Sequence, residues 1–289
     1  MDALTVIDLL LAGVLTGLVY GLMALGLSVI FGVVRVVNFA HGEMMTIAMY
    51  ATVVLFNWLG LDPFLSLLPV AAAFFGLGYL LQRGLINRFI TRPEHAQFML
   101  LVALAIILIN VLLMIFGPDA QHVQLDYLLE PVEAGALLLD RGKLLAAGVA
   151  AATAVALFAF FRLTLTGKAI RACADNHLGA LVIGLDVKRL YALTFGLGAA
   201  CVAVAGCMMI LLVDVTPTLG PGYTLLAFVI VIVGGLGSMP GALLGGVLIG
   251  VSEALAGLFI APSAKSMFSF GLLIIVLLLR PQGLLGKSA

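Results

Sequence analysis

The chain has 289 residues, of which 64% are hydrophobic and 10% are charged, and its mean hydropathy is +1.27. No soluble globular domain has this balance, so the sequence predicts a polytopic membrane protein; its long continuous apolar runs favour helices over the alternating strands of a β-barrel. The formal net charge is zero, so bulk charge indicates neither a nucleic acid nor an acidic partner.

Apolar windows without charged residues run along the whole chain. The first follows Asp2 and Asp8 with no basic residue before it, so we expect a retained span and not a cleaved signal peptide. The windows cover residues 9–34, 44–61, 63–82, 96–118, 144–161, 190–213 and 215–252, and a shorter one covers 266–279.

The window 215–252 is too long for one helix. Its 38 residues would rise about 57 Å, against a hydrocarbon core of about 30 Å. We therefore expect it to break at the glycine-rich stretch 234–241. The fold class that follows is an all-α polytopic membrane protein with about eight or nine transmembrane elements, some interrupted or re-entrant, compatible with an inverted-repeat organisation. We expect the whole chain, 1–289, to form a single transmembrane domain.

The segment 31–43 places polar side chains between two apolar runs. Arg35, Asn38, His41 and Glu43 lie within it. One interpretation is a tight turn at the membrane surface. The other is an interrupted helix whose Asn38, His41 and Glu43 line a path for a solute, since ionisable groups at membrane depth need protein or water around them.

Charged loops alternate in sign along the chain. The loops 83–95 and 162–189 and the C-terminus are basic, whereas the loop 117–143 between them is acidic. Because short cytoplasmic loops carry excess Lys and Arg, we expect the basic loops in the cytoplasm and the acidic loop outside.

The segment 166–186 joins two spans and is amphipathic. Gly167 and Gly184 bracket it, and Ala174, Leu178, Leu181 and Val182 form its better apolar face at helix spacing. An amphipathic helix outside the membrane rests on lipid headgroups or fits a groove of a partner.

When clustered glycines and a proline interrupt an apolar helix, some backbone N–H and C=O groups lose their helical partners and need others. Gly235, Gly237 and Ser238 lie in such a break, so we place them with the candidate translocation path. Most other glycines fit plain helix packing.

Five blocks of this chain resemble the permeases of branched-chain amino acid ABC importers, in the order of that family. The similarity is nearer to the shorter permease subunit than to its longer homologue. The blocks are YGLMALGLSVIFGVVRVVNFAHGE (20–43), GKAIRACADNHLGALVIG (167–184), LTFGLGAACVAVAG (193–206), GGLGSMPGALLGG (234–246) and LRPQGLLG (279–286).

The resemblance implies a subunit of the bacterial inner membrane that pairs with a second homologous permease, two cytoplasmic ATPases and a periplasmic substrate-binding protein. It implies that 162–189 is a coupling loop in which Gly167, Arg171, Ala180 and Gly184 dock the ATPase. The substrate is expected to be a branched-chain amino acid, while related permeases serve urea, amides and aromatic or other small carboxylates.

The sequence offers little for other functions. We expect no cofactor, no metal and no enzymatic activity: the three cysteines lack ligand spacing, and the four histidines lie in different segments. The terminal GKS lacks the earlier glycine of a phosphate-binding loop, because Pro281 occupies that position. The alternatives are an ion-coupled secondary transporter, with His41, Glu43 and Glu253 as candidate relay groups, or a passive channel.

Overall fold

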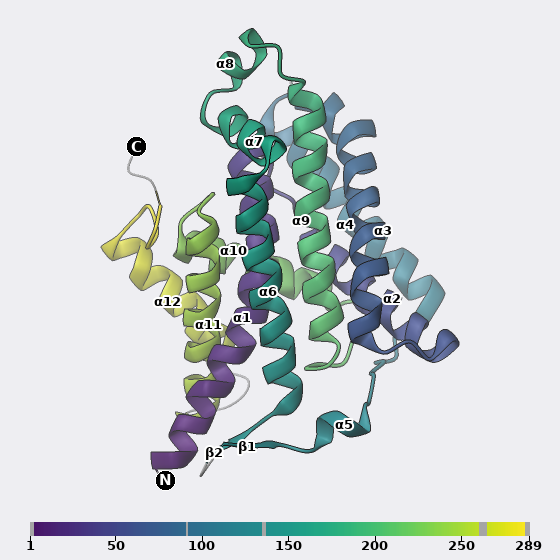
Figure 1. Cartoon of the computed structure of the whole chain (residues 1–289), viewed down its shortest axis with the longest axis vertical. Helices are drawn as coiled ribbons and strands as arrows, with labels where there is room; N and C mark the ends of the chain where they lie inside the picture. The colour runs from purple at the N-terminus through teal and green to yellow at the C-terminus, as the bar shows by residue number, and fades with distance from the viewer. Residues whose placement is uncertain (1–2, 91, 135–136, 260–264, 287–289) are drawn as a thin grey trace.

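The chain folds into a bundle of long helices, which a computed structural model describes for residues 3–90, 92–134, 137–259 and 265–286 (Figure 1). The first half contains α1 (Ala3–Val34), α2 (His41–Leu59), α3 (Pro63–Gly84), the 3₁₀ helix η1 (Ile86–Arg88), α4 (Glu94–Phe116), α5 (Asp126–Leu129) and the antiparallel hairpin β1 (Val132–Ala134) and β2 (Leu137–Leu139). The second half contains α6 (Arg141–Leu163), α7 (Leu165–Asp175), α8 (His177–Val182), α9 (Val187–Met209), α10 (Gly220–Gly234), α11 (Met239–Phe259) and α12 (Lys265–Leu279).

The number of membrane elements agrees with the expectation from the sequence. In the described part of the chain, seven helices are long and apolar enough to cross a membrane, and α10 and α12 are shorter apolar helices. The long window 215–252 does break where expected: α10 ends at Gly234 and α11 begins at Met239. Between them Gly235 and Gly237 have φ of 106° and 76°, which residues with a Cβ rarely adopt.

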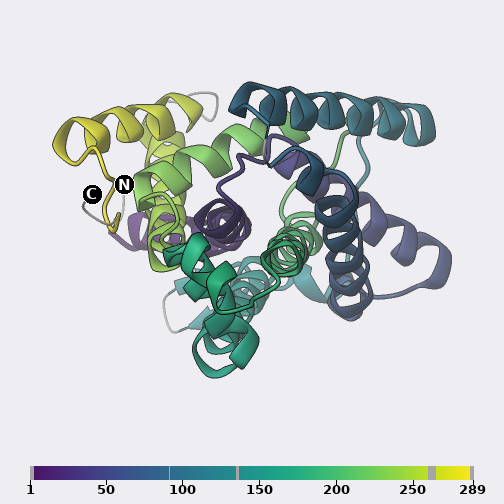
Figure 2. The same ribbon diagram turned by 90° about the horizontal axis from the view of Figure 1, so that it is seen from above.

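The centre of the bundle is the pair α1 and α9, which Figure 2 shows nearly end-on in the middle of the molecule. The apolar windows of both helices are 83% buried, against 17% for α4. Glycines allow the closest approaches: a Cβ on Gly17 of α1 would lie 2.7 Å from the carbonyl oxygen of Gly246 in α11, and a Cβ on Gly26 would lie 2.7 Å from that of Gly198 in α9. Small residues facing one another are how membrane helices come into contact.

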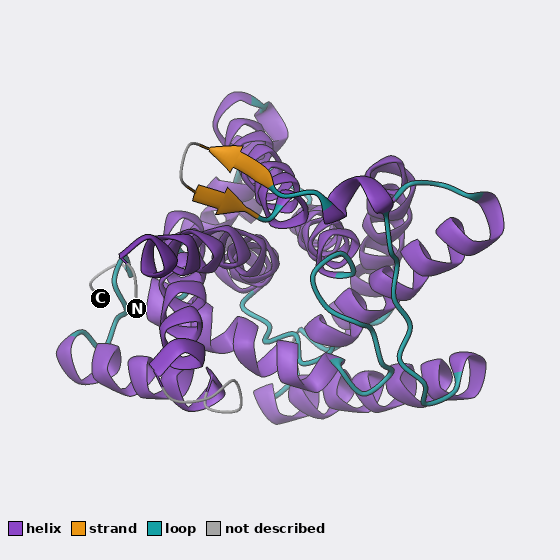
Figure 3. Cartoon of the chain, turned by 90° about the horizontal axis from the view of Figure 1, so that it is seen from below, coloured by secondary structure: helices purple, strands orange, loops and turns teal. Residues whose placement is uncertain are grey.

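The bundle has two distinct ends. One, which we call the α8 end, carries α7, α8, η1 and the turn between α10 and α11 (Figure 1). The other, the hairpin end, carries the N-terminus, α5 and the β1–β2 hairpin, which Figure 3 shows from below. The basic loops 83–95 and 162–189 therefore lie opposite the acidic loop 117–143, as the alternation of charge predicts.

Two segments of the chain, α1 to α3 and α9 to α11, have the same order of elements and run in opposite directions, as expected for inverted repeats. In each, a central helix (α1 or α9) is followed by a non-helical return segment, a helix that begins inside the bundle (α2 or α10) and a full span (α3 or α11). The long contacts correspond: α3 packs along α9 as α11 packs along α1, and α2 contacts α9 as α10 contacts α1. Because α1 runs toward the α8 end and α9 runs away from it, the two units have opposite directions.

Candidate functional site

The chain leaves α1 at the α8 end and starts α2 in the middle of the bundle. Arg35, with φ 59°, is the one described non-glycine residue with positive φ, and it follows directly on the last residue of α1. After a non-helical stretch, His41 opens α2, and its Nε2 lies 2.9 Å from the carbonyl oxygen of Met23. Met23 precedes the end of α1 by 11 residues, which is about 16 Å of helix. The structure therefore favours the interrupted helix over a turn at the membrane surface.

Asn38 shapes the return segment. Its side chain is buried, and its Oδ1 accepts a hydrogen bond from the backbone N–H of Ala40 at 3.1 Å, while its Nδ2 lies 3.6 Å from Sδ of Met44. An asparagine side chain that accepts from the backbone N–H two residues on forms an Asx turn, here just before the first residue of α2. Asn38 thus stabilises the turn that leads into α2.

The first turns of α2 and α10 meet one another inside the bundle. The N–H of Gly42 donates to Oγ1 of Thr224 at 2.8 Å, and Thr224 Oγ1 donates to Oε2 of Glu43 at 3.1 Å. A Cβ on Gly42 would overlap the carbonyl oxygen of Gly220, so only glycine permits this contact. We call His41, Gly42, Glu43, Gly220 and Thr224 the polar junction.

The electrostatics of the polar junction follow from its helix ends. The N-termini of the two helices bring backbone N–H groups and partial positive charge to one place. The carboxylate of Glu43 in the first turn of α2 is 2% exposed and interacts favourably with that charge. His41 is fully buried: its Nε2 donates, because the Met23 carbonyl can only accept, and its Nδ1 has no hydrogen-bond partner among the described residues.

A second polar group lies between α1, α10, α11 and α12. The rings of Tyr20 and Tyr223 stand 6.3 Å apart, edge to face, and Oγ of Ser269 donates to Oε1 of Glu253 at 2.9 Å. Tyr223 directly precedes Thr224, so this group borders the polar junction. Glu253, one of the three candidate relay groups, lies between α11 and α12 rather than beside His41 and Glu43.

The other predicted pathway residues lie elsewhere. Gly235, Gly237 and Ser238 form the turn at the α8 end, where Oγ of Ser238 accepts from the N–H of Gly241 at 3.2 Å. The turn packs on the C-terminal segment, since the N–H of Leu285 donates to the carbonyl of Gly234 at 2.9 Å. The whole length of α10, about 21 Å, separates this turn from the polar junction. The structure therefore brings Asn38, His41 and Glu43 together and leaves the glycine turn apart.

The segment expected to be the coupling loop folds as two short helices and not as one. Asn176, in extended conformation with φ −146° and ψ 95°, separates α7 from α8, and its Oδ1 accepts from the N–H of Gly179 at 2.8 Å. Asn favours this N-cap role over a position inside a helix, because its side chain offers the backbone an alternative partner. Figure 1 shows α8 beyond the ends of the spans and α7 beside the upper part of α9.

The loop does not form the one continuous apolar face expected for it, because the break at Asn176 separates Ala174 from Leu178, Leu181 and Val182. The side chains that α7 buries are Ile170 and Cys173, whereas Leu178, Val182 and Ile183 are 71%, 87% and 70% exposed. Burial raises the pKa of the Cys173 thiol, an effect that a hydrogen bond with Tyr191 partly offsets. The loop thus rests on α9 through α7 and presents the apolar side chains of α8 to its surroundings.

The four residues expected to dock a partner have distinct settings. A Cβ on Gly167 would overlap the carbonyl oxygen of Phe160, so this glycine seats α7 on the end of α6. Ala180 is buried in α8, and Arg171 is exposed on α7. Gly184 has φ 83°, with no atom within 4 Å of where a Cβ would stand.

Sequence reasoning missed Thr224, Tyr20 and Tyr223. The signal for a helix start at Gly220 was present, since Pro221 occupies the first turn, where proline is favoured. However, the apolar character of 215–252 concealed that this start lies inside the bundle. As for metals, the described residues contain no group of three or more His, Cys, Asp or Glu that could hold an ion.

Comparison with known proteins decides the family. A family model described as "Branched-chain amino acid transport system / permease component" matches residues 9–277. The chain belongs to this permease family. It is 33% identical to the high-affinity branched-chain amino acid transport system permease protein LivH of Salmonella typhimurium, over 95% of this chain and 94% of that protein.

Other members of the permease family are similar to this chain over nearly its whole length. The permease is 32% identical to LivH of Escherichia coli K12, with the same coverage, and 30% identical to the high-affinity branched-chain amino acid transport system permease protein BraD of Pseudomonas aeruginosa, over 96% and 95% of the two chains. The permease is thus a multi-pass membrane protein of a transport system, as the five sequence blocks indicated.

Proposed function

We propose that this chain is the membrane-spanning subunit of an ATP-driven importer and that the polar junction is the constriction of its translocation path. The observation that carries the proposal is the meeting of α2 and α10 inside the bundle. Both helices begin there, and Thr224 is hydrogen-bonded to Gly42 and Glu43. The polar junction therefore offers polar contacts to a solute, which neither lipid nor an uninterrupted apolar helix does. Broken helices of inverted repeats are where transporters hold their solutes.

The chemistry of the polar junction suits a zwitterion. The N–H groups at the start of α2 and α10 attract a carboxylate, and Glu43 attracts an ammonium group. The relatives carry the name of branched-chain amino acid transport, so we propose such an amino acid as the substrate; an amide, urea or another small carboxylate is the outcome to be tested against it.

The closed contact of Gly42 with Gly220 leaves no room for a side chain between them. Passage of an amino acid therefore requires α2 and α10 to separate. Helix–helix contacts through glycine are short and local, so a small tilt of either helix opens the constriction.

The force for that movement would come through the coupling loop. Leu178, Val182 and Ile183 give α8 an exposed apolar tip of the kind that fits a groove in a partner protein. Ile170 and Cys173 connect α7 to the core, and Gly167 connects it to α6. We propose that a cytoplasmic ATPase binds α8 and that its movement is transmitted along α9 to the polar junction.

The proposal includes an orientation in the membrane and a set of partners. The α8 end faces the cytoplasm of the bacterial inner membrane, with basic loops 83–95 and 162–189, and the hairpin end faces the periplasm. A second homologous permease completes the membrane domain, two ATPases bind the α8 end, and a binding protein delivers the substrate to the hairpin end. ATP hydrolysis resides on the partner chains.

The test is to purify the tagged permease from native membranes in mild detergent and to identify what accompanies it. A second permease and two ATPases, with hydrolysis stimulated by a periplasmic binding protein, would support the importer. Ligand screening by thermal shift of that binding protein would then identify the substrate. A lone oligomer that transports with a proton or sodium gradient, or conducts passively, would overturn the proposal.

A further inference from the structure

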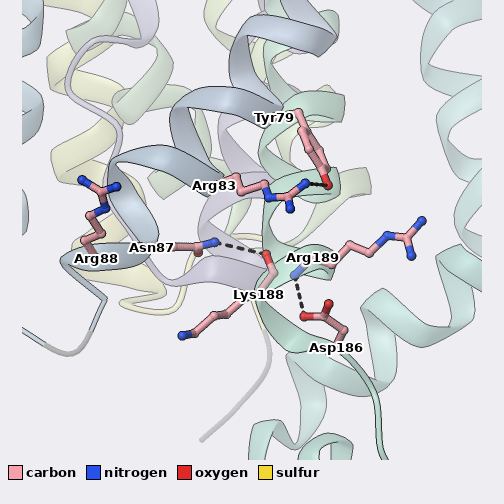
Figure 4. Close-up of a pocket in the computed structure, with 7 residues that line it drawn as sticks. All are labelled: Tyr79, Arg83, Asn87, Arg88, Asp186, Lys188 and Arg189. Atoms are coloured by element: carbon pink, nitrogen blue, oxygen red, sulfur yellow. Dashed lines mark hydrogen bonds between the residues drawn. The ribbon is translucent and has the colours of Figure 1, made fainter.

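A polar pocket of about 670 Å³ opens at the α8 end between α3 and the start of α9 (Figure 4). Its lining consists of Tyr79 and Arg83 from α3, Asn87 and Arg88 from η1, and Asp186, Lys188 and Arg189 from the start of α9. The walls are tied together, since Nδ2 of Asn87 donates to the carbonyl oxygen of Lys188 at 3.3 Å. The pocket is therefore a fixed feature of two packed elements.

Four of the seven lining side chains are cations, and they lack acidic partners. No described carboxylate forms an ion pair with Arg83, Arg88, Lys188 or Arg189. The one acid in the lining, Asp186, caps α9 by accepting from the N–H of Arg189 at 3.1 Å. Figure 4 shows the charged ends of Arg88, Lys188 and Arg189 pointing away from one another.

The position of the pocket is that of a lipid headgroup. Tyr79 lies about one turn before the end of α3, at the level where amphipathic rings meet the membrane–water boundary, and its hydroxyl lies 3.4 Å from Nη1 of Arg83. Leu80, three residues before Arg83 and so on a neighbouring strip of the same face, is 64% exposed. A cationic recess thus lies directly above an apolar, uncovered helix surface.

We infer that this pocket binds the phosphate of an anionic phospholipid. The guanidinium forks of Arg83 and Arg88 match phosphate oxygens, and Lys188 and Arg189 supply further charge. The acyl chains of the same lipid cover the exposed side of α3 around Leu80. Basic pockets between membrane helices are known sites for such headgroups, whereas the exposed apolar tip of α8 is the better surface for a protein partner.

The experiment measures binding of phosphatidylglycerol and phosphatidylcholine to the purified full-length protein by native mass spectrometry. Arg88→Gln with Lys188→Gln removes two pocket cations. Arg162→Gln with Arg280→Gln removes two exposed cations from the same end of the bundle but outside the pocket. We expect phosphatidylglycerol to bind about 25-fold more weakly to the pocket variant, from about fivefold per cation, and as in the unaltered protein to the control.

Several results would overturn the inference. Equal losses in the two variants would assign binding to general surface charge, and unchanged binding in the pocket variant would remove the site. Displacement of the lipid by inorganic phosphate at equal concentration would identify a soluble ligand. Loss of a co-purifying protein with lipid binding unchanged would make the pocket a protein contact. If the double variant does not fold, Lys188→Gln alone, with about a fivefold loss expected, decides the question.

Discussion

Thr224→Val tests whether the polar junction is held by its hydrogen bonds. Valine keeps the branched shape of threonine and removes Oγ1, which accepts from Gly42 at 2.8 Å and donates to Glu43 at 3.1 Å. Hydrogen bonds between membrane helices average about 0.6 kcal/mol, whereas leaving a buried polar group unpaired costs about 1–3 kcal/mol. Glu43 is 2% exposed and cannot turn to water. We therefore expect the free energy of unfolding to fall by about 1–3 kcal/mol.

The assay is reversible unfolding in mixed micelles, with uptake measured in parallel in reconstituted vesicles. Thr224→Ser is the matched control, because it keeps Oγ1 and loses one methyl group. The valine variant should be less stable than the serine variant and should transport less per inserted molecule. Equal stability of all three proteins would refute the reasoning, since the two contacts would then contribute nothing to the closed junction.

Four further predictions concern the coupling loop and the return segment. Gly184→Glu should abolish uptake while membrane insertion stays normal, and Gly184→Asn, which tolerates φ 83°, should retain uptake; normal uptake by the glutamate variant would exclude docking there. Gly167→Ala should lower stability by about 1–3 kcal/mol, because its Cβ overlaps the Phe160 carbonyl; unaltered thermal unfolding would contradict this packing. Cys173 should react slowly with a maleimide at neutral pH, because burial raises its thiol pKa, and a rate equal to that of the unfolded chain would show that α7 is not seated. His41→Ala removes the hydrogen bond to the Met23 carbonyl and should lower the free energy of unfolding by about 0.5–1.5 kcal/mol. It should impair uptake per inserted molecule more than it impairs folding.

Where the sequence imposed a physical limit, prediction succeeded. The length of the window 215–252 required a break, and Gly235 and Gly237 could be located in it because few other residues adopt their positive φ. The polar residues of 31–43 likewise required either a surface turn or an interruption. The choice between these two depended on the contact of His41 with Met23, eighteen residues away, which no local pattern reports.

Where tertiary contacts decide, prediction failed. Thr224 of α10 accepts from the N–H of Gly42, 182 positions earlier in the chain, so its place inside the bundle depends on a contact that no local pattern reports. The coupling loop shows a local failure of another kind. Helix periodicity grouped Ala174 with Leu178 across Asn176, but the cap at Asn176 resets the direction of the chain and leaves Leu178 exposed.

The inverted repeat explains why the polar junction, and not the central pair of helices, is the part suited to open. From this junction α2 runs to the hairpin end and α10 runs to the α8 end, so in the proposed mechanism each controls access from one side. The scaffold of α1 with α11 and α9 with α3 is joined along whole helices by glycine contacts such as Gly17 with Gly246. The junction has the hydrogen bonds of Thr224, at about 0.6 kcal/mol each on average, and one glycine contact. In the proposed mechanism, a movement transmitted from α8 separates α2 from α10 and leaves the paired central helices packed.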